Sequence, residues 1–121
     1  AVVHPAATLA QGVRLGQGVV ILARAVINPD AELDDFALVN TGAIVEHDCR
    51  VGRAASLAPA AAMGGASTLG AGAALMMGAL LRHRVAVGEH AVVGMGSVVL
   101  SDLPPLVVAW GNPARPRRTR A

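Results

Sequence analysis

Aliphatic residues recur at every sixth position along most of the chain. Every sixth residue from Val3 to Val99 is Val, Leu, Ile or Met, and four places after each of the first sixteen, from Ala7 to Ser97, stands a small residue. A helix repeats about every 3.6 residues and a plain strand every two, so neither explains this period. A short strand followed by a two-residue corner does explain it, and the pattern predicts such a repeated unit over residues 3–99.

The geometry of the unit predicts an all-β prism. The small residue and the aliphatic residue two places later point inward along one short strand, and three units close a triangular coil of eighteen residues. Strands of successive coils then pair in parallel about 4.8 Å apart, which gives a parallel β-helix of about five coils. Pro104 and Pro105 end the repeat. We therefore expect a β-helix over residues 1–103 and a C-terminal cap, loop and basic tail over 104–121.

The stretch from Ala54 to Leu81 carries no charged residue. It is longer than the roughly 20 apolar residues that can cross a bilayer as a helix. However, it contains Pro59 and five glycines, and each glycine costs about 1 kcal/mol in a helix interior relative to Ala. The stretch also keeps the period of six, so we expect no membrane segment.

The composition and the distribution of charge indicate which kinds of partner the chain can bind. The chain has 121 residues, 54% of them hydrophobic, and a net charge of +2 that comes from four arginines in the last seven positions. This distribution does not favour nucleic-acid binding. Cys49 is the only cysteine, which excludes an intrachain disulfide and is consistent with a reducing cytoplasm.

The most chemically rich segment is "NTGAIVEHDC", residues 40–49. The eighteen-residue spacing places His47 at an outward corner, in one column with Gly65 and His83. A lone outward histidine is usually surface decoration, but Asp48 beside it can fix its tautomer and raise its basicity, as general-base catalysis needs. Cys49 belongs to the inward series, so a buried core thiol is favoured over a nucleophile.

"NTGAIVEHDC" followed by "VG", together with "GVRLGQGVVILARAVINPDAEL" upstream and "GNPARPRR" near the end, is similar to the hexapeptide-repeat sugar acetyltransferases. The resemblance is to the sialic acid O-acetyltransferase and UDP-4-amino-sugar N-acetyltransferase type, and to its β-helix domain only. It implies a left-handed helix, whereas spacing alone fixes no hand and the general crossover rule favours the right. It also implies direct transfer from acetyl-CoA, with His47 as general base, Asp48 orienting its ring and the Gly65 amide holding the thioester carbonyl.

The resemblance implies further contacts with the substrates. The "GNPA" loop would lie against the nucleotide end of acetyl-CoA; a solvated basic tail is the alternative for the last arginines. Apart from the resemblance, Arg82 and Arg84 on the later coils are further candidates for binding the phosphates. Ser56 stands where the family usually has a second histidine near the site. Candidate cofactor contacts in the loop are Gly111, Asn112, Pro113, Ala114 and Arg115, and candidate substrate contacts are Asn40, Thr41 and Ser56, of which the first two are equally plausible as turn residues.

The acceptor and the assembly follow from the same reasoning. The family carries an N-terminal nucleotide-sugar domain and this chain starts where the β-helix begins, so the acceptor is expected to be a sugar or nucleotide sugar of open identity, O- or N-acetylated. Outward apolar residues predict a homotrimer, and the family places its sites between adjacent prisms. These outward residues are Val20, Val26, Leu38, Ile44, Leu80, Val92 and Val98.

Two other classes remain open. Gamma-type carbonic anhydrases share the β-helix and bind zinc through three histidines. His47 and His83 have the matching thirty-six-residue spacing, but the third position is Gly88 and His90 is one step off the corner series; we therefore expect no metal. The other class is a non-catalytic β-helix or an excised domain.

Overall fold

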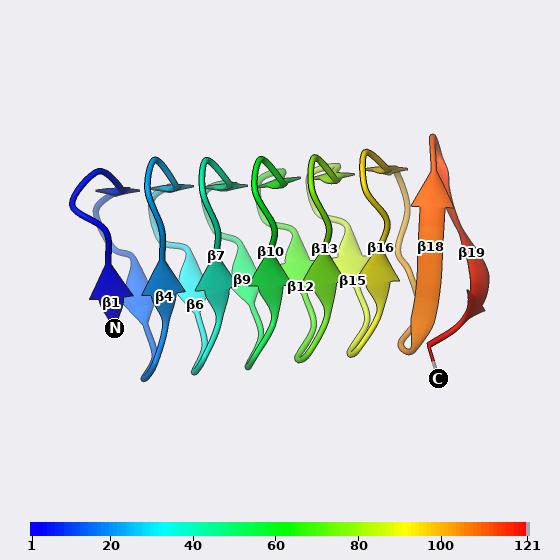
Figure 1. Ribbon diagram of the computed structural model, residues 1–121, viewed down its shortest axis with the longest axis horizontal. Helices are drawn as coiled ribbons and strands as arrows, with labels where there is room; N and C mark the ends of the chain where they lie inside the picture. The colour runs from blue at the N-terminus through cyan, green and yellow to red at the C-terminus, as the bar shows by residue number, and fades with distance from the viewer. Residues whose placement is uncertain (121) are drawn as a thin grey trace.

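The computed structural model describes residues 1–120, which form strands and corners without any helix (Figure 1). Seventeen two-residue strands follow one another every six residues, as the pattern predicts. In chain order they are β1 Val2–Val3, β2 Thr8–Leu9, β3 Arg14–Leu15, β4 Val20–Ile21, β5 Val26–Ile27, β6 Glu32–Leu33, β7 Leu38–Val39, β8 Ile44–Val45, β9 Arg50–Val51, β10 Ser56–Leu57, β11 Ala62–Met63, β12 Thr68–Leu69, β13 Ala74–Leu75, β14 Leu80–Leu81, β15 Ala86–Val87, β16 Val92–Val93 and β17 Val98–Val99.

These strands build three parallel sheets, one on each side of a triangular prism. Sheet A contains β1, β4, β7, β10, β13 and β16, sheet B contains β2, β5, β8, β11, β14 and β17, and sheet C contains β3, β6, β9, β12 and β15. Ser56 pairs with Leu38 on one side and Ala74 on the other, an offset of eighteen residues. The predicted left-handed β-helix is confirmed, with close to six coils where the sequence predicts about five.

The inward positions form a narrow aliphatic core. Ile21, Leu57 and Met63 are fully buried, and so are most small residues of the corners from Ala25 to Ala91, whereas Ala7 and Val13 in the first coil are only partly buried. Val3 and Leu9 belong to the same inward series but are 36% and 40% exposed. They lie in the first coil, where no coil stacks beneath them, so their predicted burial is not reached.

The three edges of the prism are named here by the sheets that they join. Residues 40–43 lie on the A/B edge, residues 46–49, 64–67 and 82–85 on the B/C edge, and residues 52–55 on the C/A edge. The third residue of a corner has a positive φ, 60° at Asp48 and 56° at Ala54. Short polar side chains such as Asp tolerate this conformation better than most.

The chain after Pro105 leaves the repeat and forms a hairpin of two longer strands. β18 (Val107–Gly111) pairs parallel with β16 in sheet A, and β19 (Ala114–Thr119) returns antiparallel to β18. Figure 1 shows this hairpin at the C-terminal end of the prism. Ala109 and Ala114 are buried in the core. The sequence pattern did not predict strand β19, and Ala121, the last residue of the expected tail, lies outside the described residues.

The outward residues divide the prism into two apolar sides and one polar side. The predicted outward apolar residues fall on sheet A (Val20, Leu38 and Val92) and on sheet B (Val26, Ile44, Leu80 and Val98). Sheet C instead presents Arg14, Glu32, Arg50, Thr68 and Ala86.

No helix able to cross a membrane is found in residues 1–120. The uncharged stretch from Ala54 to Leu81 contains β10 to β14 and the corners between them.

Candidate active site

His47 lies on the B/C edge, in the corner between β8 and β9, with its side chain 59% exposed. The inward residues on both sides, Val45 and Cys49, are fully buried and anchor the corner to the core. The corner is further held by the Asp48 N–H, which donates to the Pro29 carbonyl one coil earlier at 3.1 Å. The histidine is thus an exposed side chain on a rigid support.

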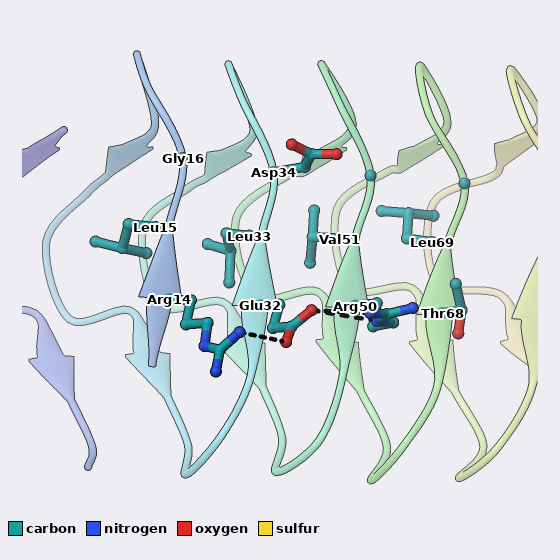
Figure 2. Close-up of a pocket in the computed structure, with 12 residues that line it drawn as sticks. Arg14, Leu15, Gly16, Glu32, Leu33, Asp34, Arg50, Val51, Thr68 and Leu69 are labelled. Carbon is teal, nitrogen blue, oxygen red and sulfur yellow. Dashed lines mark hydrogen bonds and ion pairs between the residues drawn. The ribbon is translucent and has the colours of Figure 1, made fainter. Parts of the chain in front are cut away.

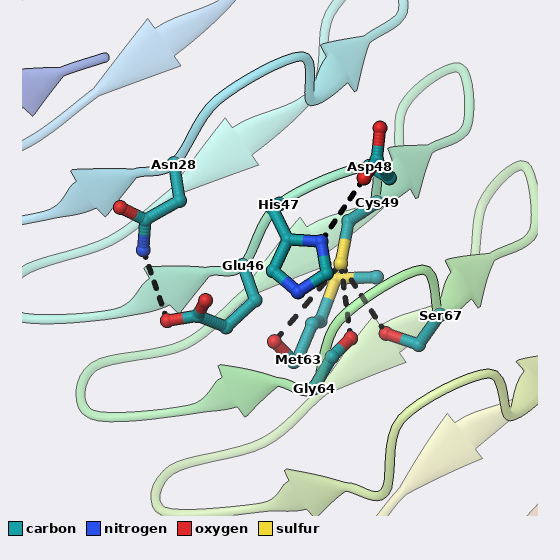
Figure 3. Close-up of polar contacts among 8 residues, drawn as sticks. All are labelled: Asn28, Glu46, His47, Asp48, Cys49, Met63, Gly64 and Ser67. Carbon is teal, nitrogen blue, oxygen red and sulfur yellow. Dashed lines mark hydrogen bonds and ion pairs between the residues drawn. The ribbon is translucent and has the colours of Figure 1, made fainter.

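The His47 ring is oriented by its neighbour. Nδ1 of His47 lies 3.0 Å from Oδ2 of Asp48 (Figure 3). An ionised carboxylate only accepts hydrogen bonds, so the neutral ring carries its proton on Nδ1 and presents the lone pair of Nε2. This is the tautomer that a general base needs.

Gly65 lies directly against the base, one coil further on. A Cβ atom at position 65 would stand 2.6 Å from Nε2 of His47 and 2.7 Å from its Cε1. Any larger residue would displace the ring, so the contact requires glycine at this corner. The structure therefore brings together His47, Asp48 and Gly65, the three residues to which the resemblance assigns the chemistry.

The backbone of Gly65 has a donor to offer. Its carbonyl accepts a hydrogen bond from the Arg84 N–H at 2.9 Å, and the next amide, Ala66, donates to the His47 carbonyl at 2.9 Å. Within residues 1–120 the Gly65 N–H itself makes no hydrogen bond. A free N–H beside a base is the arrangement that stabilises a developing oxyanion.

Cys49 is a core thiol, as its inward position indicates. It is fully buried, and Sγ lies 3.1 Å from the Gly64 carbonyl oxygen and 3.5 Å from Ser67 Oγ. Burial raises the pKa of the Cys49 thiol above its usual value, against smaller lowering contributions from its hydrogen bonds with Ser67. A protonated, inaccessible thiol is a poor nucleophile.

Glu46 occupies the other side of His47. Its Oε1 accepts a hydrogen bond from Asn28 Nδ2 at 2.9 Å, one coil earlier (Figure 3). The Asn28–Glu46 pair was not singled out from the sequence, although the eighteen-residue spacing places the two residues in one column. Of the two carboxylates that flank His47, Asp48 is the one that contacts its ring, while Glu46 bonds to Asn28.

Arg82 and Arg84 follow on the same B/C edge, in the corner one coil beyond Gly65. With His83, Ser101 and Asp102 they line an open hollow of about 610 Å³. Asp102 is also anchored to the backbone, since its Oδ1 accepts the Ala86 N–H at 2.9 Å. The hollow gives an anionic ligand two guanidinium groups along the line that starts at His47.

The remaining predicted residues lie elsewhere on the prism. Asn40 and Thr41 are on the A/B edge, where Asn40 Oδ1 accepts the Thr41 N–H at 2.7 Å, a contact typical of a turn residue. Ser56 projects from β10 on sheet A. Within one chain these residues are on other sides of the prism than His47.

The "GNPA" turn joins β18 to β19, also toward the A/B edge. The Gly111 N–H donates to Ser97 Oγ at 3.1 Å, and the φ of 113° at Gly111 favours glycine. Arg115 is the second residue of the return strand β19, while Arg117 stacks on the Trp110 ring with 5.8 Å between the guanidinium carbon and the ring centroid. The turn and His47 are thus on different edges of one prism.

The zinc alternative finds no support in the geometry. Among residues 1–120 no group of three or more His, Cys, Asp or Glu side chains is placed to hold a metal ion. Gly65 separates His47 from His83 along the B/C edge, and His90 lies on the C/A edge.

A second hollow, of about 570 Å³, lies on the outer face of sheet C (Figure 2). Glu32 is shared there between two arginines, 3.0 Å from Arg50 Nη2 and 3.7 Å from Arg14 Nη1. The side chains of Arg14 and Arg50 are 81% and 71% exposed. Such solvent-exposed ion pairs contribute about 0–1 kcal/mol each, so this side reads as a solvated face.

Comparison with known proteins bears on the site. No family model matches the sequence. A structure of GDP-perosamine N-acetyltransferase from Caulobacter crescentus, a histidine-to-alanine variant with CoA and GDP-perosamine bound, superposes with a TM-score of 0.94 at 43% identity over 95% of this chain. The acetyltransferase domain of PglB from Neisseria gonorrhoeae, in complex with acetyl coenzyme A, superposes with a TM-score of 0.94 at 35% identity, also over 95% of this chain.

The chain matches the β-helix domain of the hexapeptide-repeat sugar N-acetyltransferases. It spans little more than half of those two solved chains, 55% and 56%. A curated relative, dTDP-3-amino-3,6-dideoxy-α-D-galactopyranose 3-N-acetyltransferase from Aneurinibacillus thermoaerophilus, is 59% identical over 29 residues, which is 24% of this chain and 15% of the relative. AntD from Bacillus cereus, at 12% identity and a TM-score of 0.92, shares the fold alone.

Proposed function

We propose that this chain carries the site for acetyl transfer from acetyl-CoA to the amino group of a nucleotide-linked sugar. The observation that supports this most is the contact of His47 Nε2 with Gly65, with Nδ1 held 3.0 Å from Asp48. The similarity to proteins solved with CoA and an amino-sugar nucleotide supports the substrate class. It also favours N-acetylation over the O-acetylation that the sequence left open.

The proposed reaction is a direct transfer. His47 Nε2 takes a proton from the acceptor nitrogen as that nitrogen attacks the thioester carbonyl carbon, and the Gly65 N–H stabilises the carbonyl oxygen as it becomes negative. When the carbon–sulfur bond breaks, the leaving sulfur takes the proton back from Nε2, which releases CoA thiol and the acetylated amine. A positioned base supplies about 10²–10⁴ in rate, and Asp48 keeps the ring in the required tautomer.

The phosphates of CoA are assigned to arginines. Arg82 and Arg84 lie on the same edge as His47, in the hollow described above. The second group, Arg115 with the turn from Gly111 to Ala114, lies toward the A/B edge. Both groups contact one CoA molecule only if the turn comes from a neighbouring prism.

A homotrimer supplies that neighbour. Sheets A and B are apolar on their outer sides and meet at the A/B edge, where Met76, Met77 and Met95 are 41%, 51% and 71% exposed. Three prisms that pack through these two apolar sides form a ring that closes. In that ring we place Asn40, Thr41 and Ser56 of one chain beside the B/C edge of another, where they can contact the acceptor.

The assembly has its own test. Sedimentation equilibrium is expected to give three times the mass of the chain, and Met77→Glu, which places charge in the apolar contact, is expected to shift the protein toward monomer. Arg14→Glu, on the polar sheet C, is the matched control and should leave the trimer intact. A monomer at every concentration contradicts the assembly but leaves the corner chemistry to be tested separately.

The catalytic proposal is tested by thiol release from acetyl-CoA with a panel of nucleotide-linked amino sugars. His47→Ala is expected to lower the rate of release by about 10²–10⁴, the contribution of a positioned base. The control is His90→Ala on the C/A edge, where alanine suits the backbone because Ala54 and Ala60 adopt the same positive φ. Full activity in His47→Ala overturns the base assignment, and no release with any acceptor favours the non-catalytic alternative.

A cytoplasmic location stays a prediction, supported by the single unpaired cysteine.

A further inference from the structure

Two buried polar side chains lie behind the His47 corner, and the proposed reaction does not use them. Cys49 and Ser67 are both fully buried. They occupy the same inward corner position in successive coils, a position that holds Val13, Ala31 and Val85 in other coils. A buried polar group is unfavourable unless it is hydrogen-bonded, so alanine would serve the core better at both places.

A side-chain and a backbone donor share one carbonyl. Cys49 Sγ donates to the Gly64 oxygen at 3.1 Å (Figure 3), and the backbone N–H of Ser67 donates to the same oxygen at 3.2 Å. In the corners one coil before and one coil after, the matching carbonyls of Glu46 and Arg82 accept only the turn hydrogen bond, at 3.4 and 3.3 Å, as far as the described chain goes. The corner of Gly64 and Gly65 is therefore held by an additional donor.

The number of available protons decides which group donates and which accepts in the hydrogen bonds that link Ser67, Cys49 and Gly64. A thiol has one proton, and if it goes to the Gly64 oxygen, the sulfur is left to accept. Ser67 Oγ lies 3.5 Å from Sγ and is the group that can donate to it. Burial raises the pKa of the Cys49 thiol, so the proton that this arrangement needs is retained at neutral pH.

The Gly64 carbonyl and the Gly65 N–H belong to one peptide unit. In a planar trans peptide the two groups point in opposite directions. A carbonyl held toward the buried thiol therefore aims the N–H away from the core, to the side where His47 Nε2 lies against Gly65. A second donor on the carbonyl also polarises the peptide, and linked hydrogen bonds strengthen one another by about 10–30% per bond.

We infer that Cys49, supported by Ser67, is a positioning residue that orients and polarises the Gly65 N–H for the oxyanion. It acts through the peptide bond and never touches the substrate. The inference rests on the proposed function for the role of that N–H, but the hydrogen bond itself can be measured without any acceptor.

The experiment compares Cys49→Ala, which removes the donor, with Cys49→Ser, which restores an O–H. Losing a whole oxyanion donor costs about 10²–10³ in kcat, and here the donor is only loosened. We expect kcat to fall about tenfold in Cys49→Ala, with the KM for acetyl-CoA unchanged within about twofold, and to recover most of the loss in Cys49→Ser. The NMR resonance of the Gly65 amide nitrogen is expected to move in Cys49→Ala and to return in Cys49→Ser.

Val13→Ala is the control for loss of side-chain volume, since it lies in the same inward column two coils away from Cys49. It is expected to lower the melting temperature and to leave kcat and the Gly65 resonance unchanged. Undiminished kcat in Cys49→Ala, an unmoved Gly65 resonance, or equal losses in the Ser and Ala variants each overturn the inference. If the unmodified protein transfers no acetyl group while the Gly65 resonance responds as expected, the proposed function fails and the hydrogen-bond assignment stands.

Discussion

Replacing Gly65 with alanine tests the geometry of the site at a single atom. The added Cβ would stand 2.6 Å from His47 Nε2, whereas non-bonded carbon contacts are favourable near about 3.5 Å. The ring must therefore move by roughly 1 Å, and a displacement of that size can cost about 10² in rate. We expect kcat/KM for the acceptor to fall about 100-fold in Gly65→Ala.

Stability is expected to behave differently from activity in this variant. Gly65 has no positive φ, so alanine suits the backbone there, and a compatible Gly→Ala change stabilises a protein by about 0.4–1 kcal/mol through the unfolded state. The His47 side chain is 59% exposed and can swing outward without disturbing the core. The melting temperature should therefore stay the same or rise while activity falls.

The assay is steady-state thiol release, together with a thermal melt of each variant. The double variant His47→Ala/Gly65→Ala provides the matched comparison, because with no ring to displace, the added methyl should leave the residual rate of His47→Ala nearly unchanged. A Gly65→Ala enzyme within about threefold of the unmodified rate would refute the argument that the ring lies in contact with Gly65 during catalysis.

Three further predictions concern the orientation of the base, the core and the thiol. Asp48→Asn keeps the size of the side chain but allows an N–H to face Nδ1, so kcat should fall about tenfold with an unchanged melting temperature; an unchanged kcat would show that Asp48 does not fix the tautomer. Leu57→Ala removes a fully buried rung of the core and should lower the free energy of unfolding in urea by about 2–5 kcal/mol; a loss below 1 kcal/mol, roughly, would contradict tight packing there. Because burial raises the pKa of the Cys49 thiol above the usual 9.0, the folded chain holds this proton more tightly than the unfolded chain, so its stabilising contribution is complete below pH 9.0 and declines as the pH rises further. Cys49→Ser lacks this decline, and parallel stability curves for the two proteins up to high pH would contradict the assignment.

The period of six predicts most of the fold because each coil buries its inward residues in the same way, against the coils before and after it. An aliphatic residue such as Leu57 is buried by the coils on both sides, so its inward direction can be read from its own position. Val3 shows the limit of this reasoning, since burial also depends on a neighbouring coil that the first coil lacks. The hairpin of β18 and β19 has no period, so its pairing could not be read from the pattern.

The parts of the site that depend on the eighteen-residue spacing could be predicted from the sequence. The parts that depend on which backbone atom a side chain contacts could not. The eighteen-residue offset alone places Gly65 beside His47, and their contact agrees with it. The same offset places Cys49 and Ser67 together, but the thiol meets the Gly64 carbonyl only because the corner turns that oxygen inward. The sequence did offer one sign of this contact, because Cys49 and Ser67 are polar residues in a column that is otherwise apolar.

His47 and Gly65 stand on successive coils, so neither coil contains the site by itself. The proposed catalytic pair exists only through stacking, and its geometry does not depend on how many coils precede or follow it. A gene that gains or loses eighteen codons at either end of the prism would lengthen or shorten the molecule and leave the pair intact, whereas the same change between the two residues would divide it. Whole coils can thus be added or lost anywhere along the prism except between His47 and Gly65.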